Sequence, residues 1–307
     1  MLAAVTPRSK PAAGRLAAIA LAAFAANSVL ARLAIRPGPG GAPPPIDPAT
    51  FTAIRLASGA VALGLLLRAR PAADGRTGGP AGRWVAALLL FLYAAPFSFA
   101  YVTLPAGTGA LVLFGAVQLT MIGAGLRGGE RPHPREWAGL AAAILGLVYL
   151  DLPGIGAPSP LGVALMALAG AAWGFYSLRG RRADAPLAQT AESFLLAAPM
   201  GLLLAALAAL IAPGAHLSAA GVALAVTSGA LASGGGYAVW YAALPRLSAT
   251  RAGTIQLAVP VLAALAGVLI LGERVSLRLV VSAAAILGGV GLALSTRAAA
   301  PLRETRR

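Results

Sequence analysis

The 307-residue sequence has no cysteine and few acidic residues or histidines. Without cysteine the chain can form neither a disulfide framework nor a thiolate site. Nine residues are Asp or Glu and two are His, and they are not arranged as the paired carboxylates or ligand cluster that an enzyme centre needs. The sequence also has no polar stretch long enough for a soluble domain, so we expect its working parts to lie among the apolar segments.

The residues that are present are mostly apolar: 59% are hydrophobic, 11% are charged and the mean hydropathy is +0.82. Apolar runs of roughly 17 to 25 residues are long enough to cross a hydrocarbon core of about 30 Å, and such runs follow one another along the chain. We predict an all-α membrane protein with ten transmembrane helices. The predicted spans are residues 15–35, 49–67, 84–103, 107–126, 137–152, 160–178, 188–211, 218–244, 252–271 and 277–296.

The basic residues predict the orientation of these spans. With a cytoplasmic N-terminus, 19 Lys and Arg fall in cytoplasmic connectors and termini and 4 in outer connectors, while Arg55 inside the second span completes the 24. A composition rich in Ala, Leu, Gly and Arg, with Lys10 as the single lysine, is typical of a GC-rich bacterial genome. We therefore expect a bacterial inner-membrane protein with both termini in the cytoplasm. No nucleic-acid partner is expected, because no folded domain presents a basic face.

The two halves of the chain share a sequence pattern. Residues 129–131 and 272–274 both read GER, at an offset of 143, and AAAILG follows each of them, at residues 141–146 and 283–288. Each half holds five predicted spans, and an odd number places the second half in the membrane upside down relative to the first. Inverted repeats of this kind are typical of carriers, because two near-equivalent halves can exchange conformations; duplication without transport is the structural alternative.

The stretch YAVWYAALPRLSATRAGTIQLAVPVLAALAGVLILGERVSL, residues 237–277, resembles the eighth and ninth spans of EamA-type members of the drug/metabolite transporter superfamily. The shared features include Pro260, the terminal Gly-Glu pair and an arginine early in the second span, Arg55. In the fourth span Val117 stands where the family often has a proline, which removes the usual cause of bending there. The resemblance implies ten helices around a central cavity, in two five-helix repeats at residues 15–153 and 160–296, and export of small metabolites or drugs.

Aromatic side chains recur at helical spacing within three of the predicted spans. Such stripes either line the cavity as a cage for aromatic or cationic substrates, at about 0.5 to 2 kcal/mol for each contact, or simply pack helices together. The third span carries Tyr93, Phe97 and Tyr101, the sixth Trp173 and Tyr176, and the eighth Tyr237, Trp240 and Tyr241. Just before the last of these stripes, residues 234–236 are three glycines, which form either a hinge or a close helix crossing.

Polar residues inside the spans complete the candidate substrate-binding site. Arg55 either attracts the carboxylate of an amino acid or extends to the outer interface. Asn27 and Gln256 either bond the substrate or join helices. Glu192 closes a gate in one state, and Glu273, at a helix end, satisfies backbone groups or a nearby arginine.

The sequence contains no carboxylate in the middle of a span, which favours transport without proton coupling. We expect a monomer in lipid that needs no cofactor and exports amino acids, aromatic ones included. The alternatives are a multidrug or cationic-compound carrier and a sugar-phosphate carrier, although the latter should need several intramembrane basic residues. An intramembrane enzyme and a channel or structural subunit are more remote hypotheses.

Overall fold

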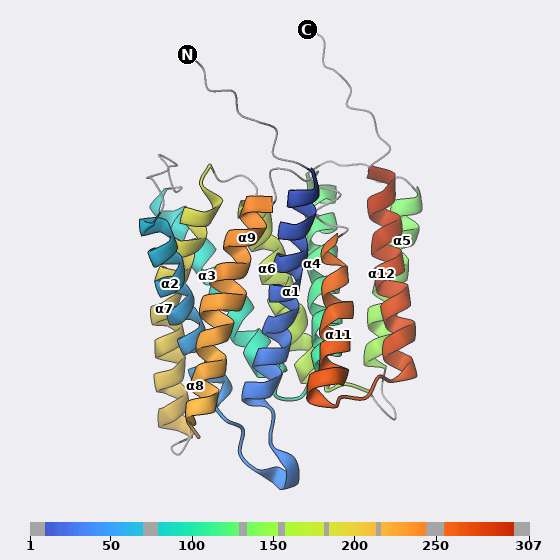
Figure 1. Ribbon diagram of the computed structural model, residues 1–307. Helices are drawn as coiled ribbons and strands as arrows, with labels where there is room; N and C mark the ends of the chain where they lie inside the picture. Colours follow the sequence, from blue (N-terminus) through green and yellow to red (C-terminus); the bar gives the residue numbers. More distant parts are fainter. Residues whose placement is uncertain are drawn as a thin grey trace, which may run out of the picture.

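The computed structural model describes residues 10–69, 79–128, 134–152, 157–180, 184–212, 216–243 and 255–297. In these ranges the chain is helical and has no strand beyond one isolated bridge, and its helices stand side by side (Figure 1). Each of the ten predicted apolar runs is helical here. The elements are α1 Lys10–Ile35, η1 Pro39–Gly41, α2 Pro48–Arg68, α3 Pro80–Ala100, α4 Ala106–Arg127, α5 Pro134–Asp151, α6 Pro160–Gly180, α7 Pro186–Ile211, α8 Ala219–Val226, η2 Thr227–Gly235, α9 Gly236–Ala243, α11 Ala258–Leu271 and α12 Leu277–Arg297.

Proline sets the beginning of several helices. Pro48, Pro80, Pro134, Pro160 and Pro186 are each the first residue of a helix. The first helical N–H has no partner within the helix and the φ of proline suits that position, so proline there costs nothing. The structure therefore starts α3 and α7 a few residues before the apolar runs that predicted them.

Among the described residues, seven helical segments are long and apolar enough to cross a membrane, and three shorter apolar helices cover Trp137–Leu150, Ala258–Leu271 and Leu277–Leu292. Large apolar side chains also face outward: Leu210 is 78% exposed and Leu269 is 82% exposed. Water would make such an outer surface unfavourable, whereas hydrocarbon would not. The chain is therefore a multi-pass membrane protein.

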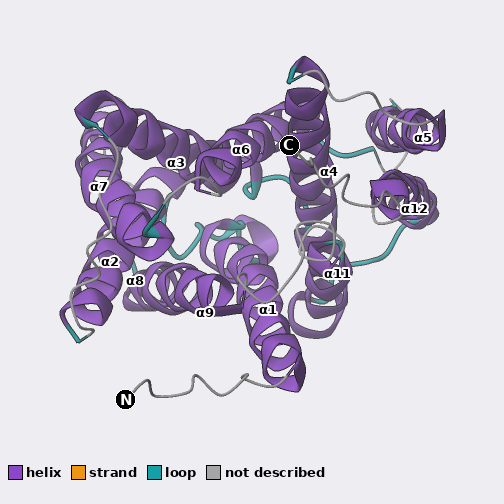
Figure 2. Ribbon diagram, turned by 90° about the horizontal axis from the view of Figure 1, so that it is seen from above, coloured by secondary structure: helices purple, strands orange, loops and turns teal. Residues whose placement is uncertain are grey.

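The helices form a closed ring when seen along their axes (Figure 2). Around this ring the neighbours are α2, α3, α6, α4, α11, α1 and the continuous rod made of α8, η2 and α9, which packs on α2 again. Helix α7 packs on the outside of α2 and α3. Helices α5 and α12 pair with each other beside α4, away from the centre of the ring.

Two spans differ from the prediction. The run 218–244 is not one α-helix, because its middle segment η2 is π-helical. Helix α11 starts at Ala258, later than the predicted residue 252, and residues 244–254 lie outside the described ranges. Pro260 consequently sits in the first turn of α11, where it removes no hydrogen bond from the helix interior.

The π-helical segment crosses α2 closely at Gly229. A Cβ atom on Gly229 would lie 2.2 Å from the carbonyl oxygen of Arg55 and 2.1 Å from Ser58 Oγ, so only glycine fits. The three glycines at 234–236 also mark a crossing, since a Cβ on Gly236 would lie 3.1 Å from Ala23 Cβ in α1. The wider turn of the π-helix brings polar side chains of η2 toward α1, next to the cavity described below.

Candidate substrate-binding site

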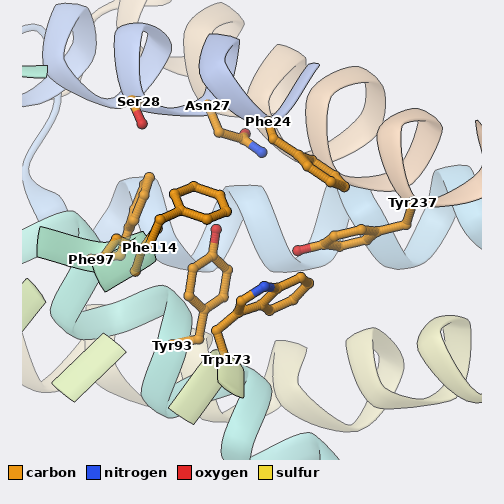
Figure 3. Close-up of a pocket in the computed structure, with 9 residues that line it drawn as sticks. Phe24, Asn27, Ser28, Tyr93, Phe97, Phe114, Trp173 and Tyr237 are labelled. Atoms are coloured by element: carbon orange, nitrogen blue, oxygen red, sulfur yellow. The ribbon is translucent and has the colours of Figure 1, made fainter. Parts of the chain in front are cut away.

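A small cavity lies inside the ring, between α1, α3, α4, α6 and α9 (Figure 3). Its volume is about 20 Å³, which is room for about one water molecule. A metabolite therefore enters only when helices or side chains move. The lining residues are Phe24, Asn27, Ser28, Tyr93, Phe97, Leu113, Phe114, Trp173 and Tyr237.

Trp173 is the centre of the aromatic part of this cavity. Its ring stacks on Tyr176 at 5.4 Å and on Tyr237 at 5.2 Å between centroids, with interplanar angles of 25° and 19°. Tyr93 approaches it at 5.0 Å in a tilted arrangement. The three aromatic stripes expected from helical spacing thus meet around one tryptophan, and the hydroxyl groups of Tyr93 and Tyr237 point toward the middle of the cavity (Figure 3).

Arg55 lies buried at the edge of this cluster, with a relative exposure of 1%. Its Nη2 donates to Tyr93 Oη at 2.8 Å, and its guanidinium carbon lies 5.1 Å and 4.7 Å from the ring centroids of Tyr93 and Phe97. The side chain therefore turns into the ring of helices instead of extending to an interface. Its Nη1 has no hydrogen-bond partner, and no described acidic side chain forms an ion pair with it.

Asn27 connects α1 to the π-helical segment. Ser228 Oγ donates to Asn27 Oδ1 at 2.8 Å, and Asn27 Nδ2 donates to Ser233 Oγ at 3.3 Å. Arg55 Nε also reaches Ser233 Oγ, at 3.4 Å. A buried polar network thus joins α1, η2, α2 and α3, and it occupies both polar atoms of the Asn27 side chain.

Five of the eleven predicted site residues line the cavity: Asn27, Tyr93, Phe97, Trp173 and Tyr237. Arg55 and Tyr176 do not line the cavity but contact lining residues. The other four do not line it either, although Tyr101 and Trp240 pack on lining residues. Tyr101 packs on Phe97 toward the end of α3, Trp240 packs on Phe24, the Tyr241 hydroxyl lies 3.4 Å from Thr190 Oγ1, and Gln256 is half-buried just before α11.

Four lining residues were not predicted. Phe24 shares a helix face with Asn27 and Ser28, which follow it by three and four residues, so the same periodicity that marked the tyrosines could have found Phe24 and Ser28. Leu113 and Phe114 lie in an unbroken apolar run that carries no distinguishing signal. Their place at the cavity follows from packing alone.

Comparisons with known proteins agree with this architecture. Residues 160–295 match the EamA-like transporter family. An uncharacterized protein of Pseudomonas aeruginosa is 49% identical over 291 residues, covering 94% of this chain and 96% of that protein. The chain contains an EamA-like transporter domain. A solved crystal structure aligns with a TM-score of 0.63 at 22% identity, over 93% of this chain and 98% of that one, which shows a shared fold.

One end of this EamA-like bundle is held by a group of contacts that we call the Arg32 cluster. Arg32 Nε lies 3.1 Å from Glu273 Oε1, and its Nη1 donates to the carbonyl oxygens of Tyr101 and Val102, each at 2.9 Å. Glu273 Oε2 accepts the N–H of Ala106 at 2.8 Å, at the first residue of α4. Because these groups also satisfy free backbone atoms at two helix ends, the cluster joins α1, α3, α4 and the end of α11.

The opposite end of the bundle is held by the Arg83 pair, which is Arg83 in α3 and Glu192 in α7. Their Nη1 and Oε1 atoms lie 2.7 Å apart, and both side chains are partly exposed. Nearby, Arg179 Nη2 in α6 donates to the Gly82 carbonyl oxygen at 3.4 Å. Charged contacts thus join helices at both ends of the EamA-like ring, while the cavity lies between them.

Proposed function

We propose that this EamA-like protein is a monomeric carrier of the bacterial inner membrane that exports small metabolites, above all aromatic and neutral amino acids, by alternating access. The observation that carries the proposal is the aromatic cavity enclosed by five helices of the ring, with charged contacts at both ends of that ring. A substrate stacked on Trp173 reaches one side of the membrane only when the Arg32 cluster or the Arg83 pair opens. The EamA-like domain points to a transporter and not to an enzyme.

The packing pattern supports ten spans in two inverted repeats, at residues 15–153 and 160–296. Exchanging α1 to α5 with α6, α7, the α8–η2–α9 rod, α11 and α12, in that order, keeps the most extensive helix contacts, although the smaller contacts of α4 with α1, α5 and α12 have no counterpart of similar size at α11. The contact of α3 with α6 becomes that of α9 with α1, and the contact of α4 with α6 becomes that of α11 with α1. The pairs α2 with α7, α4 with α11 and α5 with α12 exchange within themselves. A protein of this kind has two states of similar energy, which differ in that the two repeats have exchanged conformations, so that the cavity faces opposite sides of the membrane.

The direction of the helices supports the proposed orientation. Helix α1 starts and α12 finishes at the same end of the bundle, the upper end in Figure 1. Among the described residues, Arg15, Arg68, Arg83, Arg127, Arg135 and Arg179 belong to helix segments at that end, and Arg32, Arg36, Arg274 and Arg278 lie toward the other. We therefore place the upper end in the cytoplasm. In this orientation the Arg32 cluster closes the outer side and the Arg83 pair closes the cytoplasmic side.

Charges near the cavity argue for uncoupled transport and against two other carrier types. The acidic side chains that the structure describes lie at helix ends: Asp47 caps α2, Asp184 is exposed, and Glu192 and Glu273 pair with arginines. None of them lines the cavity to carry a proton with the substrate. A cationic drug would meet the charge of Arg55, and a sugar phosphate would find that one arginine alone.

We expect saturable counterflow of an aromatic amino acid in proteoliposomes. Uptake of labelled phenylalanine against preloaded unlabelled phenylalanine should persist after a protonophore collapses the proton gradient, because none of the described acidic side chains lines the cavity. Liposomes without protein provide the control. Loss of counterflow on adding the protonophore would contradict uncoupled transport, and flux that does not saturate would identify a channel.

A further inference from the structure

Several polar groups that face the cavity can donate a hydrogen bond to a substrate. The indole N–H of Trp173 can only donate. The Tyr93 hydroxyl accepts from Arg55 and so has its own proton left to donate, and Figure 3 shows it pointing into the cavity. Asn27 Oδ1 already accepts from Ser228, and the hydroxyl groups of Ser28 and Tyr237 can donate as well as accept. Donors for a substrate carboxylate are therefore available at several points around the cavity.

Arg55 adds a positive charge that the described part of the protein does not balance. A buried cation without a partner is strongly unfavourable, and such a residue inside a membrane protein is retained for function. Its Nη1 is unpartnered, and its Nη2 bonds the same Tyr93 hydroxyl that points into the cavity. A carboxylate of the substrate that accepts from Tyr93 and Arg55 would satisfy the charge and the free donor together.

An ammonium group finds no acidic side chain among the described residues that line this site. Aromatic faces and hydroxyl oxygens attract it, but it also meets the charge of Arg55, which no described acidic side chain offsets. Like charges at short range in a medium of low dielectric repel strongly. The α-ammonium group of an amino acid is therefore tolerated at best, whereas its carboxylate and its aromatic ring are both recognised.

We infer that the preferred substrates are aromatic monocarboxylates, whose ring stacks on Trp173 and Tyr237 and whose carboxylate binds at Arg55 and Tyr93. The inference rests on the proposed transport of small metabolites, and within that function it moves the preferred substrates from amino acids to aromatic acids without an ammonium group. It also supplies a driving force for uncoupled export. An inside-negative membrane potential drives a monovalent anion outward, and at equilibrium it supports an outside-to-inside concentration ratio of about 50-fold per 100 mV. The same potential exerts no net driving force on a zwitterion.

Three ligands that share a phenylethyl body separate the charges: 3-phenylpropionate, phenylalanine and phenethylamine. Titration calorimetry on the purified full-length protein should give binding of the anion at least about tenfold tighter than that of the zwitterion, and no measurable binding of the amine. Equal or tighter binding of phenylalanine, or any preference for the amine, would overturn the inference. Counterflow of phenylalanine in that case would leave the proposed transport function standing, whereas absence of counterflow for all three ligands would overturn both.

Arg55→Met tests the residue that carries the argument. Anion binding should weaken about 100-fold and the preference over phenylalanine should disappear, while the melting temperature should stay the same or rise because an unpaired buried charge is gone. Arg55→Lys, which keeps the charge, should retain part of the preference. Arg68→Met, at an exposed position of the same helix, is the matched control. If Arg55→Met keeps the preference for the anion, Arg55 does not recognise the carboxylate and the inference is wrong. If both Arg55 variants melt at a lower temperature and bind all three ligands equally less, Arg55 is structural and the inference is also wrong.

Discussion

Replacing Trp173 by alanine should lower kcat/KM for an aromatic substrate about 30- to 150-fold. The indole contacts three aromatic side chains at the cavity, and it offers the largest flat surface there for a substrate ring. Loss of one stacked partner costs about 0.5 to 1.5 kcal/mol beyond the apolar area that the contact buries, and the area itself adds about 1 to 2 kcal/mol. Together these terms give about 1.5 to 3.5 kcal/mol, and the middle of that range, about 2 to 3 kcal/mol, corresponds to the expected loss of kcat/KM.

The matched controls for Trp173 distinguish binding from packing. Trp173→Phe should retain transport within about tenfold of the wild type, because a stacking surface remains. Phe175→Ala, on the same helix but 44% exposed, should leave transport unchanged. Initial-rate transport in proteoliposomes, with the melting temperature of each variant, measures both quantities. Wild-type kinetics in Trp173→Ala would remove the aromatic cluster from the substrate path.

Joining the two sides of the Arg32 cluster covalently should abolish transport. The protein has no cysteine, so Arg32→Cys and Glu273→Cys introduce its only thiols, and a short bifunctional thiol reagent that is cleaved by reductant can bridge them. Bridging prevents α1 from separating from the end of α11, so one face stays closed through every cycle. We expect more than about tenfold loss of substrate flux, with full recovery after reduction.

The Arg83 pair allows the same experiment at the other end, with Arg83→Cys and Glu192→Cys. Alternating access requires both ends to open in turn, so either bridge should stop transport on its own. Before cross-linking, the protein with Arg83→Cys and Glu192→Cys should keep transport within about fivefold of the wild type, because a partly exposed ion pair contributes only about 0 to 1 kcal/mol. Undiminished flux through a protein bridged at either end would contradict the proposed mechanism.

The positions of the helices were predictable because their signals are local. Apolar length located the ten runs, and the prolines at helix starts explain the small shifts of their boundaries. The π-helical segment was not predictable, since it depends on Gly229 meeting the carbonyl oxygen of Arg55 in another helix. A hydropathy pattern contains no such information about close approach.

The candidate site was predicted in part for the same reason. Tyr93, Phe97 and Tyr237 belong to stripes whose spacing is visible in the sequence, and these side chains line the cavity. Trp240 and Tyr241 share such a stripe but do not line the cavity, because the stripe covers a wider face of α9 than the cavity does. Trp240 packs on Phe24 of α1, and Tyr241 lies next to Thr190 of α7. The pairing of Arg32 with Glu273 joins residues 241 positions apart and arises only from tertiary structure.

The central claim is that one cavity opens to each side of the membrane in turn, and a thiol at Ser28 tests it most directly. Ser28 lines the cavity and is buried. In Ser28→Cys proteins already bridged at one end, an impermeant thiol reagent is applied to right-side-out and inside-out vesicles. With the Arg32 cluster bridged, Cys should react only from the side of the Arg83 pair, and with the Arg83 pair bridged only from the opposite side. Reaction from the same side in both bridged proteins would contradict alternating access.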